Sequence, residues 1–196
     1  MYRNVGDSMY RLVLIALCYI VGALPTSYYL VWLKTKKDLR TLGSGNSGAT
    51  NAARVLGPSA FFSIVCIDAL KAYGILWFSQ AQGLESWWLL GAAAAVMLGN
   101  SYSVFLSFSG GKGVATGLGV LLFLFPPLVV LGYCVVFMLV LMRMKRVDVA
   151  SLSSALFGVV GVVLAGCSFS FILVAVAIAV WIWIRHWKNL YTLLKG

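Results

Sequence analysis

The run GLGVLLFLFPPLVVLGYCVVFMLVLM, residues 117–142, decides how many times the chain crosses a membrane. One crossing takes about 20 residues, so the run is long for one and short for two. Lys112 precedes it and a basic segment, residues 143–146, follows it. A single crossing would place these cations on opposite sides, against the preference of Lys and Arg for the cytoplasmic side. We therefore predict two short helices that turn at Pro126-Pro127, because proline cannot continue a helix without loss of a hydrogen bond.

The composition is that of an integral membrane protein. Of the 196 residues, 62% are hydrophobic and 10% are charged, and the mean hydropathy is +0.97, far above that of soluble domains. We predict one all-α membrane domain, residues 1–196, with about seven transmembrane helices, two of them short. The N-terminus is expected outside and the C-terminus in the cytoplasm. Besides the hairpin, apolar runs of spanning length occupy residues 10–33, 59–80, 85–106, 149–166 and 169–185.

Charge and cysteine content exclude other classes. The net charge of +10 comes from cations in short segments between apolar runs, which membrane orientation explains, so we expect no nucleic-acid partner. The four cysteines are widely separated and fit neither a metal site nor a disulfide framework. The first apolar run ends without a small-residue cleavage pattern, and we interpret it as a retained span in which one helix continues past Pro25.

A polar, glycine-rich segment, GSGNSGATNAAR, occupies residues 43–54. Irregular backbone at membrane depth is tolerated only where protein or water covers it. Glycines let the backbone approach a ligand and turn its amides towards an anion, and a guanidinium can bind phosphate through two parallel bonds. The alternative is a polar turn that only caps the next helix. The candidate phosphate ligands are Gly43, Ser44, Gly45, Asn46, Thr50, Asn51 and Arg54.

A second glycine loop, Gly110-Gly111-Lys112-Gly113, resembles an ATP-binding phosphate loop only in outline. No glycine stands five residues before Gly111, and Gly113 replaces the Ser or Thr that would bind magnesium. We instead expect a lysine on flexible backbone at the start of a short helix, which suits an anion. The alternative is a lysine that only extends to the membrane surface.

The C-terminal segment contains the only histidine, His186, and Asn189 lies three residues later near the same helix face. Two neighbouring cations favour a functional role for His186, and packing at a helix end is the alternative. Ser151 and Ser154 are candidates for contact with a head group, although small residues also serve helix packing. The sequence offers no cluster suited to zinc, so we expect neither a metal nor a cofactor.

Asp68 and Lys71 are charged residues inside a predicted span, and such residues are candidates for function. Residues three apart lie on one face of a helix, so mutual neutralisation is equally natural. We favour a structural pair that positions the first glycine loop.

The three polar segments together predict one anion site on the cytoplasmic side. Covalent catalysis is poorly supported, because no Ser or Cys has an evident His and acid in its local sequence. Amide donors and cations instead suit the orientation of phosphorylated reactants and the stabilisation of an oxyanion. The sequence therefore predicts transfer between phosphorylated molecules at the lipid surface.

These segments resemble the three motifs of the bacterial membrane acyl-phosphate:glycerol-3-phosphate acyltransferases, which begin phospholipid synthesis. Residues 38–57 are similar to the first motif, residues 108–116 to the second, and Arg185-His186 with Asn189 and Leu193-Leu194 to the third. The order of the motifs and the length also agree, so the resemblance covers nearly the whole chain.

The resemblance implies transfer of a fatty acyl group from acyl phosphate to the 1-hydroxyl of sn-glycerol 3-phosphate. The products would be lysophosphatidic acid and inorganic phosphate, and neither acyl-CoA nor acyl carrier protein would be the direct donor. The partners would be the two substrates and membrane lipids, in a bacterial inner membrane with the site on the cytoplasmic side. The oligomeric state is left open, and a monomer would suffice.

The same resemblance assigns roles by position. Lys112 and Arg54 would bind phosphate and developing negative charge, while His186 and Asn189 would hold glycerol 3-phosphate. The hydroxyl proton would pass to the acyl phosphate itself or to His186, and we favour the substrate. Ser44 and Asn46 would also line the site, with the phosphate pockets shaped by Gly43, Gly45, Gly110 and Gly111.

The chain departs from the family pattern at four positions. Asn100 stands for a usual histidine, Ser103 for a proline, Ser109 for a basic residue and Thr192 for an arginine. These departures spare the residues assigned to phosphate and alter their support. Two other functions therefore stay open: a non-catalytic phospholipid-binding or phosphate-binding paralogue, and a small anion transporter, which is disfavoured because no inverted repeat is evident.

Overall fold

The computed structural model describes residues 5–195, without the side chains of residues 5, 6, 86 and 188–195. Between residues 5 and 195 the regular structure is entirely helical. The chain divides into two compact units, Met1–Phe123 and Leu124–Gly196. The single functional domain stays a prediction.

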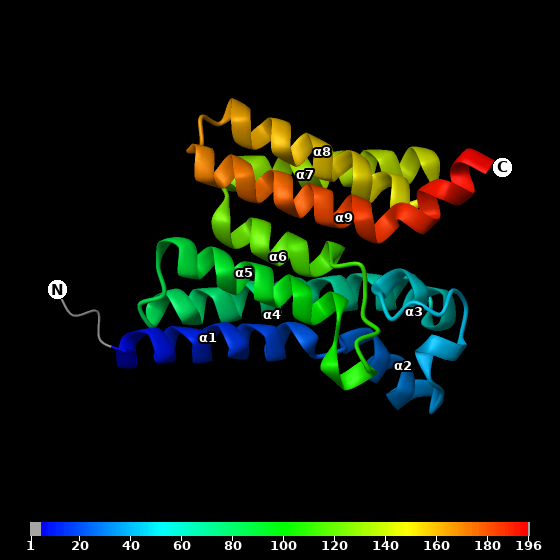
Figure 1. The fold of residues 1–196 in the computed structure, drawn as a ribbon. Coiled ribbons are helices and arrows are strands. Elements are labelled where there is room, and N and C mark those ends of the chain that lie inside the picture. Colours follow the sequence, from blue (N-terminus) through cyan, green and yellow to red (C-terminus); the bar gives the residue numbers. More distant parts are fainter. Residues whose placement is uncertain (1–4, 196) are drawn as a thin grey trace. The chain divides into compact units, whose positions relative to one another are not determined.

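The first unit is a helix bundle (Figure 1). In it α1 (Val5–Ala23) packs mainly on α5 (Ser86–Ser101) and also contacts α4 (Pro58–Ala81). Small residues allow this packing, as is common where membrane helices approach closely. A side chain at Gly22, for example, would collide with the backbone of Val96. The helices are α1 (Val5–Ala23), α2 (Thr26–Thr35), α3 (Ala49–Leu56), α4 (Pro58–Ala81), α5 (Ser86–Ser101) and α6 (Val114–Leu124), with 3-10 turns η1 (Leu39–Thr41) and η2 (Val104–Leu106).

The first span is interrupted, which corrects the prediction of one continuous helix. α1 ends at Ala23 and α2 begins at Thr26. Pro25 has no N–H to continue the helical hydrogen bonds, and the chain resumes with a bond from the Tyr29 N–H to the Pro25 carbonyl, 3.1 Å. The two helices still form one apolar segment of 29 residues, Asp7–Thr35.

The second unit is formed by α7 (Pro127–Met144), α8 (Val147–Leu164) and α9 (Phe169–Lys195). α8 packs against both α7 and α9. A side chain at Gly161 would lie 3.3 Å from Val129, so glycine keeps α7 and α8 close. Phe125 and Phe171 meet edge to face, with ring centroids 5.8 Å apart.

The lengths and composition of the helices confirm an all-helical integral membrane protein. The predicted turn at Pro126-Pro127 is also confirmed, because α6 ends at Leu124 and α7 begins at Pro127. Of the two helices of this hairpin, which were predicted to be short, only α6 is short, with 11 residues, since α7 extends to Met144 and reaches 18 residues. The orientation of the termini stays a prediction. In the described chain, six segments are long and apolar enough to cross a membrane: Asp7–Thr35, Pro58–Ala81, Trp87–Leu106, Pro127–Met144, Val147–Leu164 and Phe169–Trp187.

Candidate active site

The first glycine segment folds as a loop followed by a short helix. Gly43 and Gly45 have φ angles of +56° and +71°, a conformation that glycine adopts without steric cost. Gly48 then caps α3, so the second half of the segment is helical. Thr50 is half-buried in the first turn of α3, and Arg54 is exposed in its last turn.

Asn51 holds this loop in shape. Its side chain is buried, and its Oδ1 accepts a hydrogen bond from the backbone N–H of Ser44 at 2.8 Å. Its Nδ2 donates to the carbonyl of Leu42 at 2.9 Å and to that of Leu39 at 3.3 Å. Ser44 itself is exposed, as is Gly43. The geometry therefore favours a positioning role for Asn51, while Gly45 is exposed and Asn46 is half-buried beside it.

Replacing Asn51 with Ala is expected to lower the free energy of unfolding by about 3 kcal/mol, because a buried side chain loses three hydrogen bonds that contribute about 1 kcal/mol each. The measurement is thermal unfolding in one detergent. Ser63→Ala is the matched control, since Ser63 bonds only within its own exposed helix turn, and it should change stability by less than about 0.5 kcal/mol. Equal stability of the two variants would remove the positioning role.

The second glycine loop is held by backbone bonds to the end of α5. The Gly110 N–H donates to the Ser101 carbonyl at 3.2 Å, and the Gly111 N–H donates to the Asn100 carbonyl at 2.9 Å. Gly113 has a φ angle of +83°, and α6 begins at the next residue, as predicted. Lys112 is half-buried at this helix start.

The two loops contact each other within the first unit. The Ser47 hydroxyl donates to the Ser109 carbonyl at 3.2 Å, and Arg40 Nη1 donates to the Leu106 carbonyl at 3.4 Å. Arg40 also pairs with Asp38 at 2.7 Å. This hydrogen bond lowers the pKa of Asp38, so the stabilisation from the pair is lost only as pH falls through that lowered pKa.

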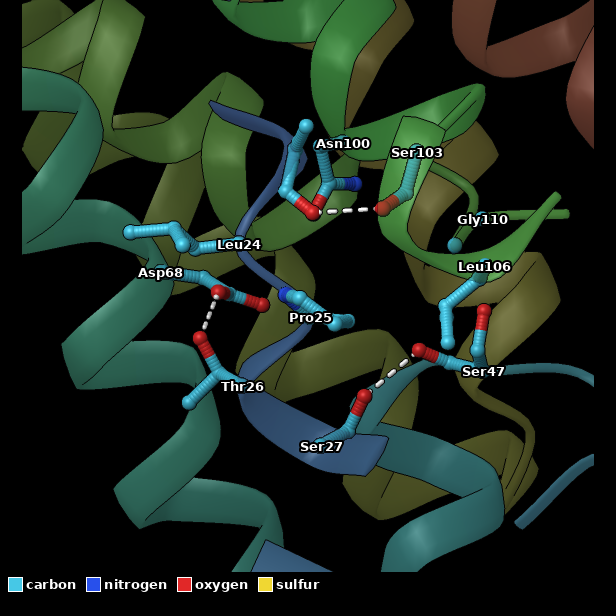
Figure 2. A pocket seen from close by; sticks show the side chains of 12 residues that line it. Leu24, Pro25, Thr26, Ser27, Ser47, Asp68, Asn100, Ser103, Leu106 and Gly110 are labelled. Carbon is cyan, nitrogen blue, oxygen red and sulfur yellow. Dashed lines mark hydrogen bonds between the residues drawn. The ribbon is translucent and has the colours of Figure 1, made fainter. Parts of the chain in front are cut away.

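A small polar pocket lies where the interrupted first span meets the two loops (Figure 2). Several of its polar residues were not among the predicted site residues. The signal was present in Thr26 and Ser27, two hydroxyl residues that follow a proline inside an apolar run. The pocket is lined by Ala23, Leu24, Pro25, Thr26, Ser27, Ser47, Asp68, Asn100, Ser103, Leu106, Gly110 and Gly111.

The third predicted motif belongs to the second unit. His186 is 2% exposed, and its Nδ1 lies 2.8 Å from the Ile182 carbonyl. Because a carbonyl only accepts, Nδ1 carries the proton in this bond. Asn189 and Thr192 lie in α9, and the side chains of both are outside the described part of the chain. The meeting of this motif with the two glycine loops stays a prediction.

Ser151 and Ser154 are buried in α8. The Ser151 hydroxyl donates to the Val147 carbonyl at 2.7 Å, and the Ser154 hydroxyl donates to the Ser151 carbonyl at 3.1 Å. These bonds within the helix favour the packing interpretation, and their contact with a head group stays a prediction. Among the side chains that the structure describes, no group of three His, Cys, Asp or Glu could hold a metal ion.

The fold and the first unit define a class: an integral membrane protein of apolar helices in which two glycine loops contact each other. Lys112 lies in the second of these loops, and Arg54 lies in the helix that follows the first. Residues 12–196 match the family described as glycerol-3-phosphate acyltransferase. The chain belongs to this family, and the resemblance noted from its motifs is confirmed.

Similar proteins cover almost the whole chain. The glycerol-3-phosphate acyltransferase of Staphylococcus saprophyticus is 35% identical over 196 residues, with 96% of each chain covered. That of Rippkaea orientalis is 34% identical over 194 residues, with 93% of this chain and 89% of the relative covered. The crystal structure of PlsY (YgiH), an integral membrane glycerol 3-phosphate acyltransferase, in its glycerol 3-phosphate form has a TM-score of 0.87 and 34% identity, covering 95% of this chain and 93% of that chain. Its lysophosphatidic acid form has a TM-score of 0.84 and 32% identity.

Proposed function

We propose that the protein transfers a fatty acyl group from acyl phosphate to the 1-hydroxyl of sn-glycerol 3-phosphate, at the cytoplasmic face of a bacterial inner membrane. The observation that carries the proposal is the bond between Ser47 and Ser109, which joins two anion-suited loops in one unit. Membership of the glycerol-3-phosphate acyltransferase family supports the acceptor. Relatives whose structures have glycerol 3-phosphate and lysophosphatidic acid forms support the acceptor and product.

The proposed reaction is a direct acyl transfer. The 1-hydroxyl oxygen of glycerol 3-phosphate bonds to the acyl carbonyl carbon, and the bond from that carbon to the bridging phosphate oxygen breaks. Phosphate leaves with the electron pair and takes up the hydroxyl proton. A protein base is unnecessary because the donor is an activated mixed anhydride. His186 is the alternative acceptor, through Nε2, since Nδ1 donates to Ile182.

The proposed roles follow the chemistry of each group. Lys112 and Arg54 balance the charge that develops on the phosphate and the acyl oxygen, where preorganised cations contribute most. Backbone amides of both glycine loops bind phosphate oxygens. Ser44 and Asn46 line the same site, and His186 with Asn189 holds glycerol 3-phosphate.

A comparison of acyl donors tests the proposal. The purified protein in phosphatidylglycerol vesicles, supplied with glycerol 3-phosphate, is expected to form lysophosphatidic acid from palmitoyl phosphate. Palmitoyl-CoA and palmitoyl-acyl carrier protein should give no product above that of protein-free vesicles. Product from palmitoyl-CoA at a comparable rate would overturn the proposal that acyl phosphate is the specific donor. The protein would then be an acyltransferase that also uses acyl-CoA.

A further inference from the structure

The interruption of the first span leaves helix ends inside an apolar segment. The last carbonyls of α1 and the first N–H groups of α2 have no partners within their own helices. Backbone groups at membrane depth must nevertheless be hydrogen-bonded, because hydrocarbon offers no water. One bond across the break comes from the main chain itself, from the Thr26 N–H to the Leu24 carbonyl at 3.1 Å. Side chains from other elements supply further bonds between Ala23 and Thr26.

Lys71 of α4 and Ser103, which follows α5, bond to backbone carbonyls of the break, and Asp68 of α4 bonds to a side chain on its far side. Lys71 Nζ donates to the Leu24 carbonyl at 2.7 Å, and the Ser103 hydroxyl donates to the Ala23 carbonyl at 2.6 Å. On the other side of the break, Asp68 Oδ1 accepts a hydrogen bond from the Thr26 hydroxyl at 2.7 Å. The break is thus bonded on both sides by residues more than 40 positions away in the sequence.

Asp68 and Lys71 also pair with each other, with Nζ and Oδ1 2.6 Å apart and both side chains 10% exposed. The spacing prediction of a pair is confirmed. The signs of the charges match the helix ends that they contact. A cation faces the carbonyl end of α1, where the helix dipole is negative, and a carboxylate faces the amino end of α2, where it is positive.

The same break is connected to both glycine loops (Figure 2). Ser27, next to Thr26, donates its hydroxyl to the Ser47 carbonyl in the first loop at 2.5 Å. Ser103, which bonds to the Ala23 carbonyl, leads into the second loop, and its own carbonyl accepts from the Phe108 N–H at 2.8 Å. A shift of the break would therefore move Ser47, a partner in the first loop, and the turn from Ser103 to Phe108 that leads into the second loop.

We propose that Asp68 and Lys71 form a positioning clamp that fixes the break at Pro25 and, through Ser27 and Ser103, sets the geometry of both glycine loops. Neither residue is placed in contact with substrate. The clamp belongs to the unliganded fold, so only its expected effect on turnover rests on the proposed function.

The test is hydrogen–deuterium exchange of the unliganded protein in lipid nanodiscs, read at residues 42–48 and 109–113. The variant is Asp68→Asn with Lys71→Gln, which removes both charges and keeps polar side chains. Amides in both loops are expected to exchange at least about tenfold faster, since their opening equilibrium tracks local stability. Exchange in the middle of α5, residues 90–96, which belongs to the same unit, should stay unchanged, and this distinguishes local loosening from general unfolding of that unit.

The matched control applies the same substitutions to the exposed ion pair of α1, Asp7→Asn with Arg11→Gln, a pair 2.7 Å apart. It should leave exchange in both loops within about twofold of the unmutated protein, because exposed pairs contribute little. Lys71→Arg, which keeps a cation at the carbonyl end of α1, should also retain protected loops. A folded Asp68→Asn, Lys71→Gln protein whose loops exchange like the unmutated protein would overturn the clamp.

If that double variant does not fold, Thr26→Val decides the question. It removes only the hydroxyl bonded to Asp68 and keeps the ion pair and the side-chain shape. Residues 42–48 are expected to exchange at least about threefold faster, and unchanged exchange would again overturn the clamp. Because no substrate is present, a failed clamp and a failed acyltransferase assignment give separate results.

Discussion

Replacing Lys112 with Met is expected to lower kcat/KM for acyl transfer by about a thousandfold, because loss of one preorganised group that stabilises developing negative charge costs about that factor. Met keeps an unbranched apolar stem of similar length, which suits a half-buried position at the start of α6. The fold should therefore survive, and thermal unfolding should change little. The rate is measured from lysophosphatidic acid formed with palmitoyl phosphate and glycerol 3-phosphate.

Lys34→Met is the matched control for this experiment. Lys34 is exposed in the last turn of α2 and lies outside the glycine loops, so its loss should change kcat/KM by less than about threefold. A Lys112→Met protein that keeps more than about a tenth of the unmutated kcat/KM would remove Lys112 from the catalytic site.

Replacing Gly110 with Ala is expected to destroy activity and to destabilise the protein by about 2–3 kcal/mol, as overpacking does. A Cβ atom at Gly110 would collide with the Asn100 carbonyl oxygen and would lie 2.6 Å from the Ser101 carbonyl carbon. The obstacle is backbone that also accepts the Gly110 and Gly111 hydrogen bonds. The loop cannot move aside without losing the contacts that define it.

Gly74→Ala separates this collision from the general effect of adding a methyl group. Gly74 is exposed within α4, and a Cβ there meets no heavy atom within 4 Å. Ala should stabilise this helix by about 0.5–1 kcal/mol and leave activity unchanged. The pair is compared by thermal unfolding and by turnover, and a Gly110→Ala protein as active as Gly74→Ala would contradict the geometry given for the second loop.

The helices could be predicted where prolines and apolar runs in the local sequence determine where a helix begins or ends. Pro126-Pro127 marked the turn between α6 and α7 because two prolines in an apolar run leave few alternatives. Pro25 did not reveal the break in the first span, because a single proline also fits a kinked helix. What fixes that break is contact with Asp68, Lys71 and Ser103, and contacts over such separations are not visible in local sequence.

The candidate site was predicted in part for the same reason. Glycine content and neighbouring cations located both loops, and the spacing of Asp68 and Lys71 indicated their pairing. The division of residues 43–54 into loop and helix was not foreseen, nor was the inward role of Asn51, because its three bonds depend on how the loop folds back on itself. The hydroxyls of Ser27 and Ser103 acquire a role only once the break in the first span is known.

The most direct test of acyl transfer from acyl phosphate is the stoichiometry of a single reaction. The purified protein in phosphatidylglycerol vesicles is mixed with palmitoyl phosphate and radiolabelled glycerol 3-phosphate, and inorganic phosphate and labelled lysophosphatidic acid are followed in the same samples. We expect one lysophosphatidic acid for each phosphate released, and neither above background with Lys112→Met. Phosphate release without lysophosphatidic acid would contradict acyl transfer. The absence of any product from a folded protein that binds glycerol 3-phosphate would also contradict it, and would favour a binding protein.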